Sequence, residues 1–253
     1  MGMDHLEFVG RYLREPGVEI GAFKTPIPGI KPTYVDRFTT YAGEATLADH
    51  IGDACELPFG DSSLRYVASS HVLEHVANPL AALAEWHRVL RHGGIIYLVV
   101  PDRRKTFDHR RPVTPAGHML ADFRNGVTQS DATHIDDFVY GLDWSMYSPG
   151  TPRGSEMAAR EELASVYRRS VAAGLEINIH FHVFESSSLT GLIELGNREG
   201  VWRGSIDVVD VAEAFPESNP IGFLVVARVR KPFLDRMLHL LGRGGRRPAP
   251  KAP

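Results

Sequence analysis

The sequence has one cysteine, no excess of either charge and no long apolar run, and each shortage excludes a class of protein. Cys55 alone cannot form an intramolecular disulfide or a paired-cysteine metal motif, which favours a reducing, cytoplasmic setting. The 28 basic and 31 acidic side chains nearly cancel, which argues against a nucleic-acid partner. The apolar run at residues 95–100 is too short to cross a bilayer, and the first residues lack a secretory-signal pattern. We therefore expect no membrane insertion.

With 253 residues, 43% of them hydrophobic, the chain can bury the core of one large α/β domain. We expect that domain over residues 1–241, followed by a basic tail, residues 242–253, whose proline and glycine content predicts disorder. Strand and helix patterns alternate through residues 17–102, stop over residues 103–178 and then resume. The interruption predicts an insertion that covers the active site and selects the substrate.

Short apolar stretches predict the strands of the sheet, at residues 18–20, 34–35, 64–69, 95–100, 202–211 and 222–229. The fourth is apolar almost throughout, which is typical of a strand covered on both faces. The three prolines within residues 24–32 predict a loop. Asn78 and Pro79 can cap and open a helix, which we expect Gly93 and Gly94 to end. The other predicted helices are residues 3–14, 155–173 and 186–195, and HFHVF is read as a strand.

Acidic and small residues follow the ends of the first predicted strands, which is where open α/β sheets bind ligands. Glu19 and Gly21 lie in EIGA at the end of the first strand, and Asp36 ends the second. A carboxylate at Asp36 can accept hydrogen bonds from both hydroxyls of a ribose. This pattern predicts a nucleoside-containing cofactor at this edge of the sheet.

The order of these segments resembles the cofactor half of the class I S-adenosylmethionine-dependent methyltransferases (EC 2.1.1). The resemblance implies a Rossmann-like α/β sheet with helices on both faces and S-adenosylmethionine as the cofactor. Residues 23–26 depart from the family, which commonly has further glycines there, so this loop must take a different course. The cofactor-binding residues implied by the resemblance are Glu19, Gly21, Ala22, Asp36 for the ribose, Asp53 and Ala54 for the adenine, and Ser70 and His71 for the methionine.

Methyl transfer to an alcohol needs a base that removes the hydroxyl proton, or a metal ion that acidifies it. Asp102 follows a buried strand and precedes arginines that could hold an anionic or polyhydroxylated acceptor. His134, with Asp136 and Asp137, could supply a base and its orienting acid, or part of a hard-metal site.

A further pair of histidines lies just after the insertion. His180 and His182 alternate with apolar residues, so in a strand both imidazoles would project to one face. Glu74 and His75 also resemble an acid/base pair, although most family members use such residues for packing. We expect His134 or His182 to act as the base, helped by Asp136 or Asp137, with Mg²⁺ as a candidate ion at Asp102, His134 and Asp137.

The pattern PDRRKTFDHRRPVT, followed by His134 and HFHVF, resembles an actinobacterial subgroup of these enzymes. It includes the sugar 1-O-methyltransferases of mycobacterial methylmannose polysaccharide synthesis. The subgroup implies methyl transfer to a hydroxyl of a sugar or oligosaccharide, such as a methylated mannoside, in polysaccharide biosynthesis. A homodimer is a candidate assembly.

Two other functions stay open. A methyltransferase for a small natural product, such as a polyketide or quinone, would have an acceptor pocket lined mainly by aromatic side chains. The insertion is instead rich in Arg, Asp and His. A catalytically inactive, methyltransferase-like binding module would fail to bind the cofactor, and the unusual PIPGIKP loop at residues 26–32 keeps this alternative open.

Overall fold

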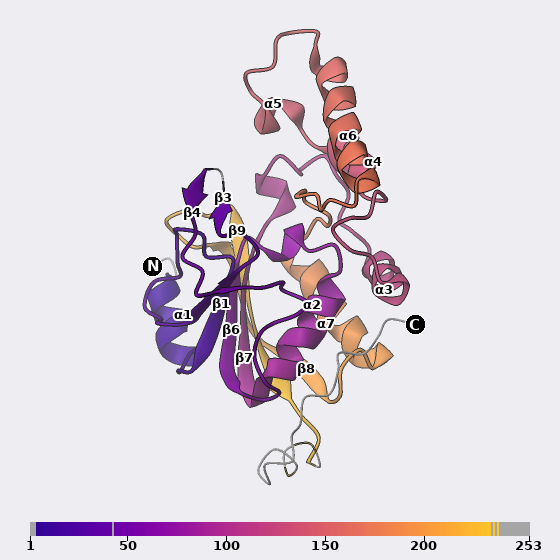
Figure 1. Ribbon diagram of the computed structural model, residues 1–253. Coiled ribbons are helices and arrows are strands. Elements are labelled where there is room, and N and C mark those ends of the chain that lie inside the picture. Colours follow the sequence, from indigo (N-terminus) through magenta and orange to yellow (C-terminus); the bar gives the residue numbers. More distant parts are fainter. Residues whose placement is uncertain (1–3, 42, 234, 236, 238–253) are drawn as a thin grey trace.

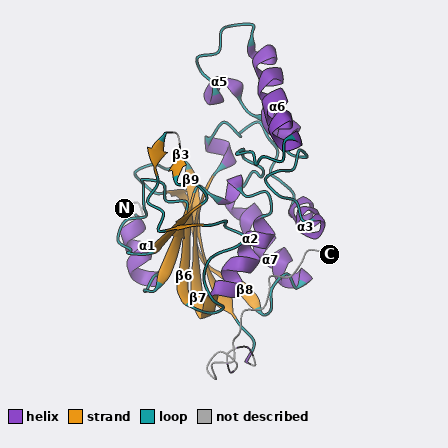
Figure 2. Cartoon of the chain, viewed as in Figure 1, coloured by secondary structure: helices purple, strands orange, loops and turns teal. Residues whose placement is uncertain are grey.

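A single seven-stranded sheet forms the centre of the protein in a computed structural model that describes residues 4–41, 43–233, 235 and 237 (Figures 1 and 2). The strand order is β5-β2-β1-β6-β7-β9-β8, and β9 runs antiparallel to both of its neighbours, whereas the other adjacent pairs are parallel. The predicted Rossmann-like α/β fold is confirmed. The strands are β1 Gly17–Ile20, β2 Thr33–Asp36, β5 His50–Ile51, β6 Leu64–Ser70, β7 Leu90–Pro101, β8 Ser205–Phe215 and β9 Gly222–Arg230.

Helices cover both faces of the sheet, as predicted. On one face lie α2 (Pro79–Val89) and α7 (Ser186–Glu199), with α3 (Ala116–Asn125) packed against these two helices, and on the other face lies α1 (His5–Tyr12) (Figure 1). Successive side chains of β7 point into the two cores in turn. Ile96, Leu98 and Val100 join the core beneath α2 and α7, whereas Ile95, Tyr97 and Val99 join the core beneath α1. This explains why the strand is apolar almost throughout.

The connection between β1 and β2 is a loop, as its prolines predict, and no helix forms among these described residues. The face that such a helix would cover is filled by α1, which precedes β1. Phe8 of α1 is fully buried, and its ring packs edge-on against Phe215 at 5.6 Å between centroids. Between β2 and β5 the chain forms a small hairpin, β3 (Thr40–Tyr41) with β4 (Glu44–Ala45).

The predicted insertion after β7 contains three further helices, α4 (Ile135–Gly141), α5 (Trp144–Tyr147) and α6 (Glu156–Ala172). They have a hydrophobic core of their own, which includes Phe138, Leu142, Trp144 and Ala164. Figure 1 shows α5 and α6 standing away from the sheet. Short 3-10 turns occur at Leu73–His75 (η1) and Arg103–Lys105 (η2). Among the described residues, none of the helices has the length and apolar character needed to cross a membrane.

The structure corrects two predictions of secondary structure. Helix α2 ends at Val89 and β7 starts at Leu90, so Gly93 and Gly94 lie within the strand and do not end the helix. The segment HFHVF is not a strand, and its backbone pairs with no strand of the sheet. The limits of the domain and of the insertion stay predictions, and the predicted disordered tail lies outside the described residues.

The start of α2 gives a testable difference between two predicted caps. The Asn78 side-chain oxygen accepts a hydrogen bond from the Ala81 amide at 3.0 Å, whereas Ser155 makes no such bond to α6. We expect Asn78→Ala to lower the free energy of unfolding by about 1 kcal/mol. Ser155→Ala should change it by less than about 0.5 kcal/mol. Urea denaturation of both variants checks this, and equal losses would contradict the assigned cap.

Candidate functional site

A cavity of about 300 Å³ opens at the carboxyl ends of β1, β2 and β6. This is the switch point of the sheet, because the chain proceeds from β1 to one side and from β6 to the other. The insertion and the segment after it also contribute to the wall. The lining residues used below are Gly21, Phe23, Asp36, Arg37, Phe38, Tyr41, Asp53, Ala54, Ser70, His71, Val72, His75, Gln129, Glu176 and Asn178.

Gly21 lets the backbone turn sharply at the mouth of β1. Its φ is +69°, and a Cβ atom there would lie 2.4 Å from Cγ2 of Val72. Its amide donates to the Val35 carbonyl oxygen at 2.9 Å. Any larger side chain would both strain this turn and fill space beside the cavity. The position fits the close backbone approach that a bound cofactor requires.

Two carboxylates, Asp36 and Asp53, lie on the cavity wall. Asp36 ends β2, and its Oδ1 accepts a hydrogen bond from the Phe38 amide at 3.1 Å. Asp53 Oδ1 accepts from the Cys55 amide at 2.6 Å, and its Oδ2 lies 3.3 Å from the Arg37 guanidinium. Arg37 also pairs with Glu176, so one arginine joins the cofactor side of the cavity to the end of the insertion.

The cavity wall includes six of the eight predicted cofactor-binding residues: Gly21, Asp36, Asp53, Ala54, Ser70 and His71. Glu19 and Ala22 are buried and do not line it. Glu19 Oε1 instead accepts a hydrogen bond from the Ile27 amide at 2.9 Å. Glu19 therefore holds the proline-rich loop that replaces a helix after β1. Burial raises the pKa of this carboxyl to about 7.

Histidines and a buried carboxyl gather at the cavity near the end of β6. His71 is 35% exposed and adopts a positive φ of +55°, which is uncommon for a residue with a side chain. Its Nδ1 lies 3.7 Å from Oε1 of the buried Glu74, and Nε2 of His75 lies 3.9 Å from the same oxygen. Burial raises the pKa of Glu74 to about 7. Burial and, next, the charge of His180 lower the pKa of His71 and of His75, the latter to about 3.

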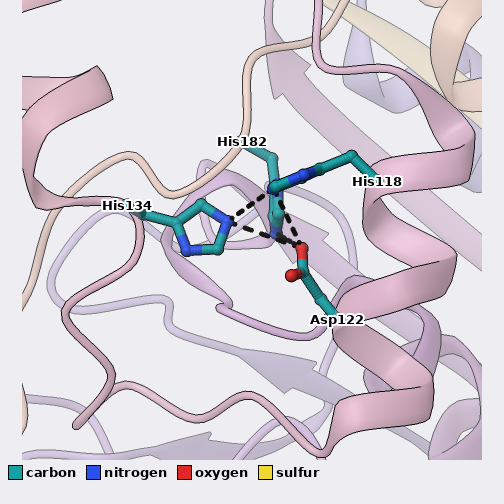
Figure 3. A group of neighbouring side chains, drawn as sticks. All are labelled: His118, Asp122, His134 and His182. Carbon is teal, nitrogen blue, oxygen red and sulfur yellow. Dashed lines mark hydrogen bonds and ion pairs between the residues drawn. The ribbon is translucent and has the colours of Figure 1, made fainter.

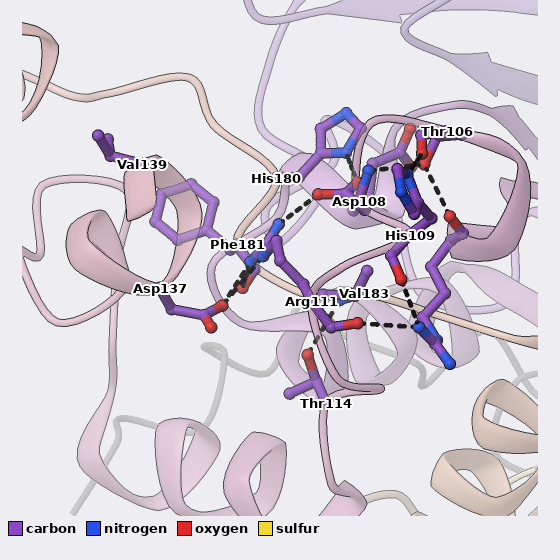
Figure 4. A network of polar contacts seen from close by, with 12 residues as sticks. Thr106, Asp108, His109, Arg111, Thr114, Asp137, Val139, His180, Phe181 and Val183 are labelled. Atoms are coloured by element: carbon purple, nitrogen blue, oxygen red, sulfur yellow. Dashed lines mark hydrogen bonds and ion pairs between the residues drawn. The ribbon is translucent and has the colours of Figure 1, made fainter. Parts of the chain in front are cut away.

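Behind these histidines lies a chain of ionic groups, of which Asp108 and Arg111 are buried (Figure 4). His180 Nδ1 is 2.5 Å from Asp108 Oδ2, and the other oxygen of Asp108 accepts from Arg111 at 2.7 Å. Arg111 is fully buried and also donates to Asp137 at 2.6 Å. Although burial alone would raise the pKa of Asp108, His180 and Arg111 outweigh it and lower that pKa. The His180 ring meets the His75 ring edge-on at 4.6 Å between centroids, which connects this chain to the cavity.

The predicted catalytic residues do not line the cavity. His134 and His182 are buried together, with ring centroids 4.9 Å apart, and they lie with His118 and Asp122 (Figure 3). Burial and, next, the charge of His134 lower the pKa of His182 to about 3, so it is a weak base. Asp136 is an exposed partner of Arg168. His180 and His182 therefore belong to different clusters, because the segment is not the strand that the alternation assumed.

The predicted metal ligands Asp102, His134 and Asp137 are not brought together. Asp102 pairs with the guanidinium of its neighbour Arg104 at 2.6 Å, and Asp137 pairs with Arg111. Each carboxylate thus already has a cationic partner, and only His134 lies in a group of metal-ligating side chains.

Several residues at or near the site were not predicted from the sequence. Arg37 directly follows the predicted Asp36, yet its bridge to Glu176 joins positions far apart in the chain. Asp108 lies just before Arg110 and Arg111, and its partner His180 is 72 positions away in the sequence. The one available signal was local: His118 and Asp122 are four residues apart, which places them on one face of a helix.

Residues 30–98, from just before β2 into β7, match the family described as "Methyltransferase domain". This part of the chain is therefore similar to a methyltransferase domain. The strand order above is that of the Rossmann-like class I methyltransferase fold. The match leaves β1, the insertion and the closing strands outside it.

Curated relatives match over short segments. A demethylmenaquinone methyltransferase of Staphylococcus epidermidis is 49% identical over 45 residues, which are 18% of this chain and 19% of the relative. An uncharacterized 37.1 kDa protein in transposon TN4556 of Streptomyces fradiae is 46% identical over 52 residues, 21% of this chain and 15% of that protein. The matched segments thus span less than a fifth of these relatives.

Solved structures align with this chain over most of its length at low identity. A SAM-dependent methyltransferase from Methanosarcina mazei is 18% identical, covers 91% of this chain and 100% of its own, and gives a TM-score of 0.46. A possible histamine N-methyltransferase from Thermotoga maritima is 18% identical, with coverage of 90% and 88% and a TM-score of 0.44.

The buried Glu19 predicts how stability depends on pH. Because its folded pKa of about 7 exceeds the ordinary value of 4.5, the protonated form is favoured by folding, and its contribution is lost as the pH rises from 4.5 through 7. Glu19→Gln should remove this loss, which is about 3 kcal/mol. Urea denaturation measures the free energy of unfolding of both proteins at pH 4.5 and pH 8. We expect the difference, variant minus wild type, to be larger at pH 8 than at pH 4.5. The exposed Glu194→Gln is the control, and a parallel pH dependence of wild type and Glu19→Gln would contradict the assignment.

Proposed function

We propose that this protein transfers the methyl group of S-adenosylmethionine to a hydroxyl group of a sugar or oligosaccharide. The observation that carries the proposal is the composition of the cavity at the switch point. It combines a glycine turn and two carboxylates suited to a nucleoside with histidines suited to a proton transfer.

The residues on the cavity wall fit the cofactor. When bound, S-adenosylmethionine supplies a methyl group on a positively charged sulfur, which needs no further activation. Gly21 leaves room for close backbone approach, Asp36 would accept the ribose hydroxyls, and Asp53 with Ala54 would contact the adenine. Phe38 and Tyr41 add apolar surface, with ring centroids 5.9 Å apart.

We assign the role of general base to His71. It lines the cavity, and burial together with the charge of His180 lowers its pKa, which keeps the imidazole neutral and able to accept a proton. The acceptor hydroxyl would give its proton to His71 as its oxygen attacks the methyl carbon. The carboxyl of Glu74, 3.7 Å from His71, would stabilise the imidazolium formed. His180, held by Asp108, acts as a positioning residue.

Polar groups from beyond the sheet favour a polyhydroxylated acceptor. Gln129, Glu176 and Asn178 bring amide and carboxylate groups to the cavity wall, and these can bond several hydroxyls of one sugar. The three predicted Mg²⁺ ligands do not converge. Whether the reaction requires Mg²⁺ is therefore tested by adding the ion to the assay.

A quinone-like acceptor is the second candidate. Phe23, Phe38 and Tyr41 form an aromatic group on the cavity wall, with Phe23 edge-on to Tyr41 at 5.6 Å between centroids. The segment shared with demethylmenaquinone methyltransferases also favours it. Methyl transfer to partly methylated mannosides or to a demethylated quinone, each assayed with and without Mg²⁺, separates the two acceptors.

Cofactor binding is the first test. We expect S-adenosylhomocysteine to bind the wild type with micromolar affinity in calorimetric titration, and Asp36→Ala to weaken binding about 10- to 100-fold, because a hydrogen-bonded charge is lost. Asp207→Ala, on the exposed edge strand β8, is the matched control. A wild type that does not bind would exclude the enzyme and favour an inactive binding module.

The base has its own test. His71→Asn should lower kcat about 10²- to 10⁴-fold while cofactor binding persists. His180→Asn removes a positive charge beside His71, so the pKa of His71 rises and the acidic limb of the kcat/KM profile moves to higher pH. His109→Asn, in the same region but exposed, should leave the profile unchanged. An unmoved limb in His180→Asn, or an unchanged kcat in His71→Asn, would refute these roles.

A further inference from the structure

Three histidines and an aspartate converge between the insertion and the body of the domain, away from the cavity wall (Figure 3). His118 and Asp122 come from one face of α3, His134 precedes α4, and His182 lies in the segment that leads to α7. One donor atom from each of the four lies within 4.8 Å of every other. We propose that these side chains form a binding site for a divalent transition-metal ion of the zinc type.

The distances fit a tetrahedral ion. With bonds of about 2.0–2.1 Å, neighbouring donor atoms around zinc lie about 3.3 Å apart. Nε2 of His118 lies 3.0 Å from Nε2 of His134 and 3.3 Å from Asp122 Oδ2. The same oxygen lies 3.5 Å from Nε2 of His134 and 3.7 Å from Nε2 of His182. Four edges of the expected tetrahedron are thus close to their ideal length.

Without an ion, the polar groups of this cluster are poorly satisfied. The two facing nitrogens of His118 and His134 can share only one proton. Asp122 Oδ2 is buried and, within the described part of the chain, has no hydrogen-bond donor. A buried carboxylate oxygen without a donor is unfavourable, and a cation removes the deficit.

The surroundings suit a bound ion. Thr133 Oγ1 lies 3.0 Å from Nδ1 of His134, the contact that orients a ligating imidazole. Nε2 of His182 lies 3.1 Å from the Ala77 carbonyl oxygen and can donate to it when no ion is bound. Coordination through Nε2 would give up this hydrogen bond and place the ring proton on Nδ1. His118 is 48% exposed and gives the ion a route from solvent.

Three imidazoles and a carboxylate select zinc-type ions over magnesium, which prefers oxygen ligands. Four protein ligands leave no open position, which is typical of a structural site. The ion would therefore hold together α3, the residue before α4 and the segment that leads to α7. The second group of metal-ligating side chains, Glu74, His75 and His180, adjoins the cavity, and Nδ1 of His180 is already held by Asp108.

The test uses the untagged full chain after treatment with a chelator, without cofactor, so that its result is independent of the proposed function. We expect one Zn²⁺ per chain, bound with a dissociation constant of about 1 µM or tighter. Co²⁺ should give the visible ligand-field absorption of a tetrahedral complex, and Zn²⁺ should raise the melting temperature.

Variants locate the ion. Asp122→Asn and His118→Ala should each weaken Zn²⁺ binding about 100-fold or more and abolish the cobalt spectrum. His118→Ala removes a half-exposed ring and keeps the test independent of folding. His109→Ala, also a half-exposed histidine after β7, should bind as the wild type does. Absence of binding to the wild type, or equal affinity of His118→Ala and His109→Ala, would overturn the proposal.

Discussion

The candidate site depends on one buried cation. Arg111 is fully enclosed, and moving a guanidinium out of water is unfavourable unless its charge and donors are satisfied. Asp108 and Asp137 satisfy them, and the Phe138 ring lies beneath the guanidinium at 5.6 Å. Because Asp108 lies in the segment after β7 and Asp137 in α4, the arginine joins these two parts of the insertion to each other. It also fixes Asp108, and through Asp108 the imidazole of His180 that adjoins the cavity.

The same logic explains how the fold tolerates an unusual connection after β1. Prolines in that connection exclude a helix, so the loop needs other anchors. Glu19, in β1, supplies one anchor, because its carboxylate accepts a hydrogen bond from the Ile27 amide. Helix α1 covers the face of the sheet that a helix after β1 would otherwise cover. A residue that resembles a cofactor ligand in sequence thus acts as a support for the loop beside the cofactor site.

Sequence reasoning reached the parts of the protein that are specified locally. The apolar strand before Asp102, the Asn78 cap and the turn at Gly21 each follow from neighbouring residues, and so do the carboxylates at the ends of β2 and β5. The histidines could not be assigned in this way. Whether His134 or His180 lies beside the cavity depends on contacts between residues that are not neighbours in sequence, such as Asp108 with His180, which are 72 positions apart. The alternation of His180 and His182 was misleading because it presumes a strand, whereas this segment is held by hydrogen bonds to Glu74, Ala77 and Thr114, which lie outside the strands of the sheet.

The cover supplied by α1 has a consequence for the order in which the chain can fold during synthesis. The helix is made before the strands of the sheet, and its partners are Tyr97 in β7 and Phe215 and Asp210 in β8. The hydroxyl of Tyr12 and its acceptor, Asp210, are 198 positions apart. Long-range contacts of this kind form late, since the loop they close must first be ordered. Helix α1 therefore leaves the ribosome well before its partners and docks late, and one face of the sheet stays open until the closing strands have emerged.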